Sequence, residues 1–139
     1  MKIRKVGGDM SIKEENEKQA ARIREQTNAR NKMTYYKGLI DKTNVEIEKC
    51  NNILKSADNL NSSVETLRGN IEKLTFQIYD AIKEESRGAQ RAKEECSTIS
   101  NQVASLESAI NTSLSELQRN LSTYQNSYAS WQARYNSLC

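Results

Sequence analysis

The chain has 139 residues, of which 21 are basic and 18 acidic, giving a net charge of +3 without any histidine or proline. Its 36% hydrophobic residues are too few for a thick globular core but enough for narrow seams between long helices. The charges form no basic stripe, no apolar stretch approaches a membrane span and no signal peptide is evident, so we expect no nucleic-acid binding, no membrane insertion and no general secretory export.

The residue types argue against an enzyme. Without histidine the chain lacks the common base of neutral-pH catalysis, and its single glycines do not make a phosphate-binding loop. Cys50, Cys96 and Cys139 lack the spacing of a metal site, so we expect no metal and no cofactor. We expect Cys50 and Cys96 to be small core residues, and an odd number of reduced thiols indicates a cytoplasmic protein.

The first ten residues are expected to form a flexible leader. Gly-Gly-Asp codons before Met10 can spell a purine-rich bacterial ribosome-binding sequence, which favours a bacterial gene that starts at Met10. A genuine leader over 1–10 is the alternative. Residues 11–139 are expected to form one helical domain.

The first predicted helix covers about 11–57. Ser11 and Glu14 have the spacing of a capping box, which predicts the helix start. From Met33 the apolar positions alternate in steps of three and four, the pattern of a helix that packs along a partner. This stripe is Met33, Tyr36, Ile40, Thr43, Ile47, Cys50, Leu54 and Ala57.

A turn is predicted at about 58–63, because "DNLNSS" contains residues that favour turns and helix caps. Ser62 and Glu65 then predict the start of a second helix over about 63–110. Its stripe is expected to shift by one residue between Ile78 and Ile82. The expected stripe is Leu67, Ile71, Leu74, Ile78, Ile82, Glu85, Ala89, Ala92, Cys96, Ile99, Val103, Leu106 and Ile110.

A third helix is predicted over about 113–139, after a turn or kink at 111–113. Ser113 and Glu116 have capping-box spacing, although a continuous helix with a shifted stripe is the alternative. The expected stripe is Leu114, Leu117, Leu121, Tyr124, Tyr128, Trp131, Tyr135 and Leu138.

These elements predict an all-α fold. The two long helices have nearly equal lengths, which indicates an elongated, coiled-coil-like antiparallel hairpin with a third C-terminal helix or helical extension.

Two groups of residues are candidates for binding a partner. Phe76 is rotated away from the predicted seam, and Asp80 lies one turn further on the same face, so they can act as an apolar anchor and a charge that orients the partner. The alternative is that Phe76 packs on the third helix or on a second copy of the chain, with Asp80 in solvent. The aromatic stripe of the third helix is the second candidate, although such a stripe more often belongs to a core: Tyr124, Tyr128, Trp131 and Tyr135.

The sequence "FQIYD", Phe76 to Asp80, resembles the F-x-x-x-D motif of small helical proteins encoded beside LXG toxins of bacterial type VII secretion. In the wider WXG100-like group a W-x-G motif lies at the hairpin turn, and "LRG", Leu67 to Gly69, stands in a comparable place without the tryptophan. The Y-x-x-x-D/E export signal is absent, since Tyr36 is followed at that spacing by Ile40.

The resemblance implies a non-enzymatic partner or targeting chaperone that binds the helical N-terminal domain of a secreted toxin, with Leu67 and Gly69 near the contact. The partner would be that toxin or another small helical protein, with a hetero-oligomer favoured over a homo-oligomer. The resemblance also implies a bacterial cytoplasmic location, with export beside the partner by a non-Sec route. The alternative is a structural, homo-oligomeric coiled-coil subunit or adaptor.

Overall fold

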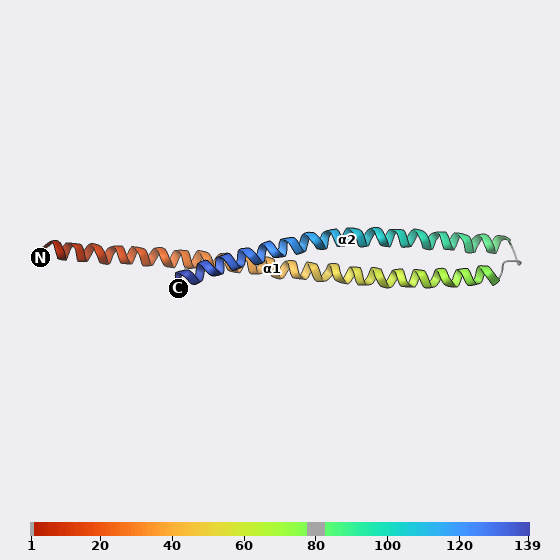
Figure 1. The fold of residues 1–139 in the computed structure, drawn as a ribbon, viewed down its shortest axis with the longest axis horizontal. Helices are drawn as coiled ribbons and strands as arrows, with labels where there is room; N and C mark the ends of the chain where they lie inside the picture. The colour runs from red at the N-terminus through yellow and green to blue at the C-terminus, as the bar shows by residue number, and fades with distance from the viewer. Residues whose placement is uncertain (1, 78–82) are drawn as a thin grey trace. The chain divides into compact units, whose positions relative to one another are not determined.

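The computed structural model contains two long helices, α1 (Lys2–Gln77) and α2 (Lys83–Leu138), and the described residues contain no strand (Figure 1). The structure describes the backbone of residues 2–77 and 83–139 and the side chains of 11–74 and 87–139. The chain divides into two compact units. Unit 1 combines Met1–Asn44 with Arg119–Cys139, and unit 2 is Val45–Gln118.

In unit 2 the two helices pack side by side in opposite directions. Lys93 pairs with Glu72 at 3.4 Å, and further along α2 the Oγ of Ser97 accepts a 3.1 Å hydrogen bond from Arg68. The facing residue number on α1 therefore falls as the number on α2 rises. This confirms the prediction of an all-α fold with paired helices.

The seam of unit 2 is the row of side chains that each helix turns toward the other. On both helices these residues recur in steps of three and four, which keeps them on one face of a helix. Val64, Ile71 and Cys96 form a buried cluster with Ala89 and Ala92 against it. Among the described side chains, the seam is Ile47, Cys50, Leu54, Ala57, Asn61, Val64, Arg68 and Ile71 on α1, and Ala89, Ala92, Cys96, Ser100, Val103, Glu107, Ile110, Leu114 and Leu117 on α2.

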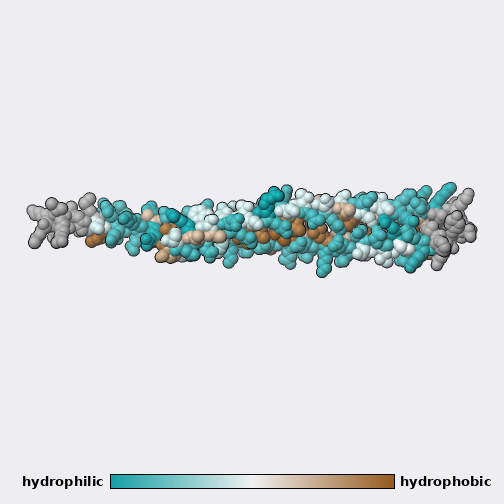
Figure 2. All heavy atoms as spheres, in the orientation of Figure 1, coloured by the Kyte–Doolittle hydropathy of each residue, from teal (hydrophilic) through white to brown (hydrophobic). Residues whose placement is uncertain are grey.

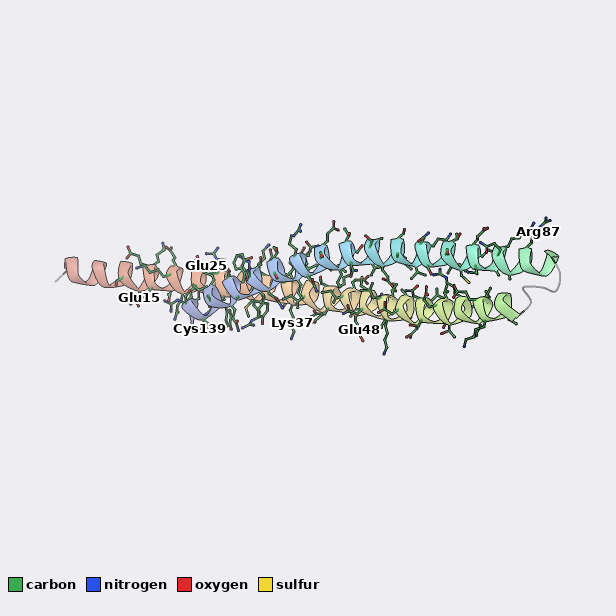
Figure 3. The ribbon with its side chains drawn as sticks, turned by 45° about the vertical axis from the view of Figure 1, so that its right-hand side comes forward. Glu15, Glu25, Lys37, Glu48, Arg87 and Cys139 are labelled. Atoms are coloured by element: carbon green, nitrogen blue, oxygen red, sulfur yellow. The ribbon has the colours of Figure 1, made fainter. Side chains whose placement is uncertain are left out.

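Unit 1 is held by a second antiparallel contact between the helices. Gln26 Nε2 donates a 2.8 Å hydrogen bond to the carbonyl oxygen of Leu138, and the rings of Tyr36 and Tyr124 have centroids 6.5 Å apart. Cys139 lies at the end of this contact, and α1 continues past it toward Glu15 (Figure 3). The seam here is Gln26, Ala29, Met33, Tyr36, Ile40 and Thr43 on α1, and Leu121, Tyr124, Tyr128, Trp131, Tyr135 and Leu138 on α2.

The predicted turn at 58–63 is wrong, because these residues lie inside α1. The helix itself satisfies their hydroxyl groups: Ser63 Oγ donates to the carbonyl oxygen of Asn59, and Thr66 Oγ1 donates to that of Ser62, both one turn earlier. Ala57, Asn61 and Val64 also continue the seam without interruption. Packing against α2 therefore outweighs the local preference for a turn.

The predicted third helix is absent, since residues 111–113 lie within α2. Thr112 Oγ1 donates a 3.1 Å hydrogen bond to the carbonyl oxygen of Ser108, as a threonine inside a helix does. The predicted helix start at Ser11 is wrong as well, because α1 begins at Lys2 and so includes most of the expected flexible leader over 1–10. Whether residues 11–139 form a single domain stays a prediction.

Gly69 offers a simple test of the unbroken α1. Nothing lies within 4 Å of the place where a Cβ would stand on Gly69. We therefore expect Gly69→Ala to raise the free energy of unfolding by about 0.5–1 kcal/mol, because alanine loses less backbone entropy in a helix interior. Urea unfolding followed by circular dichroism measures this change. A lower stability would mean that residue 69 is not inside a helix.

Candidate protein-binding surface

A row of large apolar side chains lies outside the seam of unit 2. Ile53, Leu60, Leu67 and Leu74 follow one another on α1 at intervals of seven residues, and the first three each stand immediately before a seam position. Their exposed fractions run from 41% to 55%. Because seven residues make almost two helical turns, the four side chains share one face of α1.

Helix α2 adds two side chains to the same side of unit 2. Ile99 and Leu106 are also seven residues apart and are 39% and 47% exposed. Ile53, Leu60 and Leu106 line one groove, whose floor reaches the seam residues Ala57 and Val103. We call the set that consists of Ile53, Leu60, Leu67, Leu74, Ile99 and Leu106 the apolar strip.

Most positions that border the apolar strip carry no charge. On each helix, a residue three positions after or four positions before a strip residue is its neighbour on the surface. The exposed neighbours are Lys49, which precedes Ile53, Glu95, which precedes Ile99, and the uncharged residues Ser56, Ser63, Asn70, Gln102 and Ala109. Figure 2 shows apolar side chains gathered between the two helices of unit 2 with hydrophilic side chains to either side. The strip is therefore an apolar surface whose borders are mostly uncharged.

Between Ile53 and Leu74 the acidic side chains of α1 lie away from the apolar strip. Asp58, Glu65 and Glu72 each stand two residues before a strip leucine, roughly 200° around the helix at about 100° per residue. Glu65 and Glu72 pair with Arg68 and Lys93 respectively. These three carboxylates thus lie on another face of α1 than the strip.

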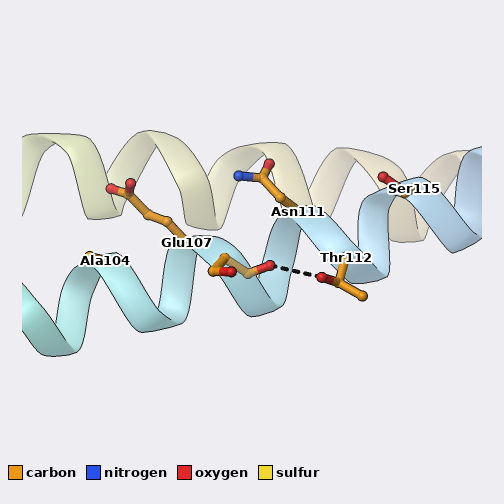
Figure 4. Close-up of a pocket in the computed structure, with 6 residues that line it drawn as sticks. Ala104, Glu107, Asn111, Thr112 and Ser115 are labelled. Atoms are coloured by element: carbon orange, nitrogen blue, oxygen red, sulfur yellow. Dashed lines mark hydrogen bonds between the residues drawn. The ribbon is translucent and has the colours of Figure 1, made fainter.

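Three polar side chains occupy seam positions where a helix pair usually places apolar residues. Arg68 Nε, Ser100 Oγ and Glu107 Oε1 are buried and have no hydrogen-bond partner among the described residues. Glu107 extends from α2 toward α1 (Figure 4). Loss of water around this carboxyl and the nearby carboxylate of Asp58 raise the pKa of Glu107 above its ordinary value.

The predicted aromatic site lies in the seam of unit 1. Tyr124 packs against Tyr36, and Tyr135 accepts a 2.9 Å hydrogen bond from Arg30, whose guanidinium carbon is 5.5 Å from the ring centroid. Tyr128 and Trp131 are half-buried on the same face of α2. The four aromatic side chains therefore contribute to packing within the chain, and their role in partner binding stays a prediction.

The other predicted site residues have different positions. Leu67 is 52% exposed and belongs to the apolar strip, and Gly69 is half-buried two residues later. Asp80 and the side chain of Phe76 lie outside the described residues. The prediction missed Ile53, Leu60, Leu74, Ile99 and Leu106 as surface residues, although four apolar residues at intervals of seven on α1 were visible in the sequence.

Among the described residues, no three histidine, cysteine, aspartate or glutamate side chains come together as they would around a metal ion. No helix in the described part of the chain has the length and apolar character needed to cross a membrane. Cys50, Cys96 and Cys139 are free thiols, and Cys96 is buried in the seam of unit 2. Comparison with protein-family models, curated proteins and solved structures found no match.

Proposed function

We propose that this protein is a non-enzymatic interaction factor that binds another polypeptide by helix–helix packing. The observation that supports the proposal is the apolar strip of unit 2, whose six large side chains are 39–55% exposed. A helix with apolar residues both in its seam and beside it has the pattern of a helix that packs on two neighbours. One neighbour is the other helix of the chain, and the second is the partner.

The candidate partner is the helical N-terminal domain of a secreted toxin, for which this protein acts as a targeting chaperone in type VII secretion. The helical pairing of α1 and α2 fits such a role, and the F-x-x-x-D motif at Phe76–Asp80 supports it. Export then takes place from the bacterial cytoplasm without the general secretory route. The neighbouring genes of the source organism supply the toxin domain for a binding test.

We expect Leu60→Asp with Leu67→Asp to weaken binding to that purified toxin domain at least tenfold, measured by isothermal titration calorimetry. Losing an apolar anchor from the centre of an interface costs about 2 kcal/mol or more. The matched control is Asn51→Asp with Ser62→Asp, which adds the same charges at exposed positions on another face of α1. Equal affinity in the strip variant and the wild type would exclude the apolar strip as the binding surface.

The Phe76 and Asp80 pair predicts a separate result. Phe76→Ala and Asp80→Ala should leave the helical circular dichroism unchanged and reduce export of the toxin in the native host, because an anchor and an orienting charge are lost. Export is measured from the amount of toxin in the culture medium. Normal export in both variants would remove the motif from the proposed mechanism.

The second candidate function is a structural coiled-coil subunit built from several copies of this chain. The uncharged residues along most of the border of the apolar strip favour it, because identical surfaces can meet there without like charges facing each other. The two functions differ in what the purified chain binds, since a structural subunit needs no second gene product.

A further inference from the structure

The apolar strip of unit 2 has no helix packed over it in the described part of the chain. Its side chains recur at intervals of seven on both helices, so the strip is itself a seam-like row and is not a scatter of single exposed residues. The groove lined by Ile53, Leu60 and Leu106 opens directly onto the seam residues Ala57 and Val103. A helix laid in this groove therefore extends the existing core and does not create a separate one.

We propose that a second copy of this chain covers the apolar strip with its own apolar strip, so that the two copies of unit 2 form a four-helix bundle. This inference rests on the proposed function, because both require the strip to bind helices. It goes further because it names the polypeptide that covers the apolar strip in the purified protein, which is a second copy of the chain. The contact is isologous, with the same residues contributed by each copy around a twofold axis.

The charge distribution favours a second copy as the occupant. An isologous contact brings every side chain near its own equivalent, so charges on the contact surface would repel one another. Five of the seven bordering residues are uncharged, namely Ser56, Ser63, Asn70, Gln102 and Ala109, and the two charged ones, Lys49 and Glu95, have opposite signs. Between Ile53 and Leu74 the acidic residues of α1 lie on the other side, where Glu65 and Glu72 have basic partners. The strip is thus compatible with itself electrostatically.

The dimensions also suit a helical bundle. From Ile53 to Leu74 the apolar strip runs along about 32 Å of α1 at about 1.5 Å per residue, which is six helical turns. Helix pairs in bundles pack through rows of this kind at separations of roughly 8–10 Å. Leucine and isoleucine fill the space between facing helices, and serine or asparagine at the borders can hydrogen-bond across it.

The experiment is the mass of the purified full chain, measured by light scattering after gel filtration at micromolar concentrations. The expected mass is twice the 15.8 kDa of one chain. Leu60→Asp with Leu106→Asp should halve this mass while the helical circular dichroism stays within a tenth of the wild-type value. A wild-type mass of one chain, or of any number of chains other than two, overturns the proposal.

The matched control is Ser62→Asp with Ser108→Asp, in which the same two charges are added two residues further along each helix. Both serines are exposed and lie on another face, so this variant should remain dimeric. If the strip variant loses helicity, Leu67→Gln with Ile99→Gln provides a milder test on the same surface. A strip variant that keeps the dimer, or a control that loses it, contradicts the proposal.

The outcome can be separated from that of the proposed function. A monomeric wild-type chain whose strip variant fails to bind the toxin domain would disprove the second copy and leave the interaction factor intact. A dimer that the strip variant disrupts, with toxin binding unchanged, would support the second copy and remove the strip from toxin binding.

Discussion

Replacing Val103 with aspartate is expected to destabilise unit 2 by roughly 3 kcal/mol or more, enough to unfold much of it at 37 °C. Val103 is only 6% exposed and lies in the seam near Ala57. A charged side chain there loses its water without gaining a cationic partner, which is among the most costly single changes in a protein. The measurement is the loss of helical circular dichroism during urea titration.

The control for this prediction is Ser105→Asp, two residues along α2. Ser105 is exposed and lies outside the apolar strip, so its aspartate stays hydrated and should cost far less helicity. The Val103 variant should also regain part of its stability below about pH 4, where the new carboxyl is protonated. Equal stability of the two variants at neutral pH would show that Val103 is not in the seam.

The second large effect is expected from Glu107→Gln, which should raise the melting temperature at pH 7. Loss of water and the nearby Asp58 carboxylate raise the pKa of Glu107, so the folded state binds its proton more tightly than the unfolded state does. Protonation therefore stabilises the fold. This stabilisation is complete below the ordinary glutamate pKa of about 4.3 and is lost as the pH rises through the raised pKa.

Glutamine has the size of glutamate without its charge, so this contribution to the pH dependence should disappear in the variant. The difference in melting temperature between variant and wild type should be small near pH 4 and grow toward pH 7, as measured by circular dichroism. Glu116→Gln is the control, because Glu116 is exposed on the same helix. A variant that melts below the wild type at pH 7 would refute the proposed repulsion. Asp58→Asn should reproduce part of the gain.

The sequence predicted the helical class and much of the seam because apolar residues occupy most seam positions. From Met33 to Ala57 and from Leu114 to Leu138 the predicted stripes coincide with the half-buried and buried side chains. In these stretches the three-and-four spacing of apolar residues leaves only one choice of face. Composition supported the same conclusion, since the chain contains no proline to interrupt a helix.

The prediction failed where polar residues stand in the seam. Arg68, Ser100 and Glu107 hold seam positions, and each directly follows an apolar residue of the strip: Leu67, Ile99 or Leu106. Assigning the apolar neighbour to the seam moved the predicted stripe by one residue, or about 100° around the helix. The predicted stripe therefore had to shift by one residue after Ile110 to reach Leu114 and the following apolar residues. The observed seam from Ser100 to Leu138 keeps the three-and-four spacing without any shift.

The candidate surface was hidden by the same misassignment. Leu67, Leu74, Ile99 and Leu106 were all assigned to the stripe inside the hairpin. Only Leu67 was also placed near a partner contact, so the strip as a whole was not recognised as a docking surface. Turn-forming residues at 58–63 contributed, because a reversal there placed Ile53 and Leu67 on separate helices. Local preferences for turns cannot reveal that α2 packs along this whole stretch, since the contacts involve residues about 20–50 positions away in sequence.

The polar seam residues limit how far the helices of unit 2 can slide along each other. A pure row of leucines would pack almost equally well after displacement by one seven-residue repeat. Such a displacement would move Glu72 from Lys93 to the neighbourhood of Ser100, and Arg68 from Ser97 to that of Ala104, so both pairings would be lost. The polar residues in the seam thus lower the stability of the helix pair but favour a single alignment of the two helices.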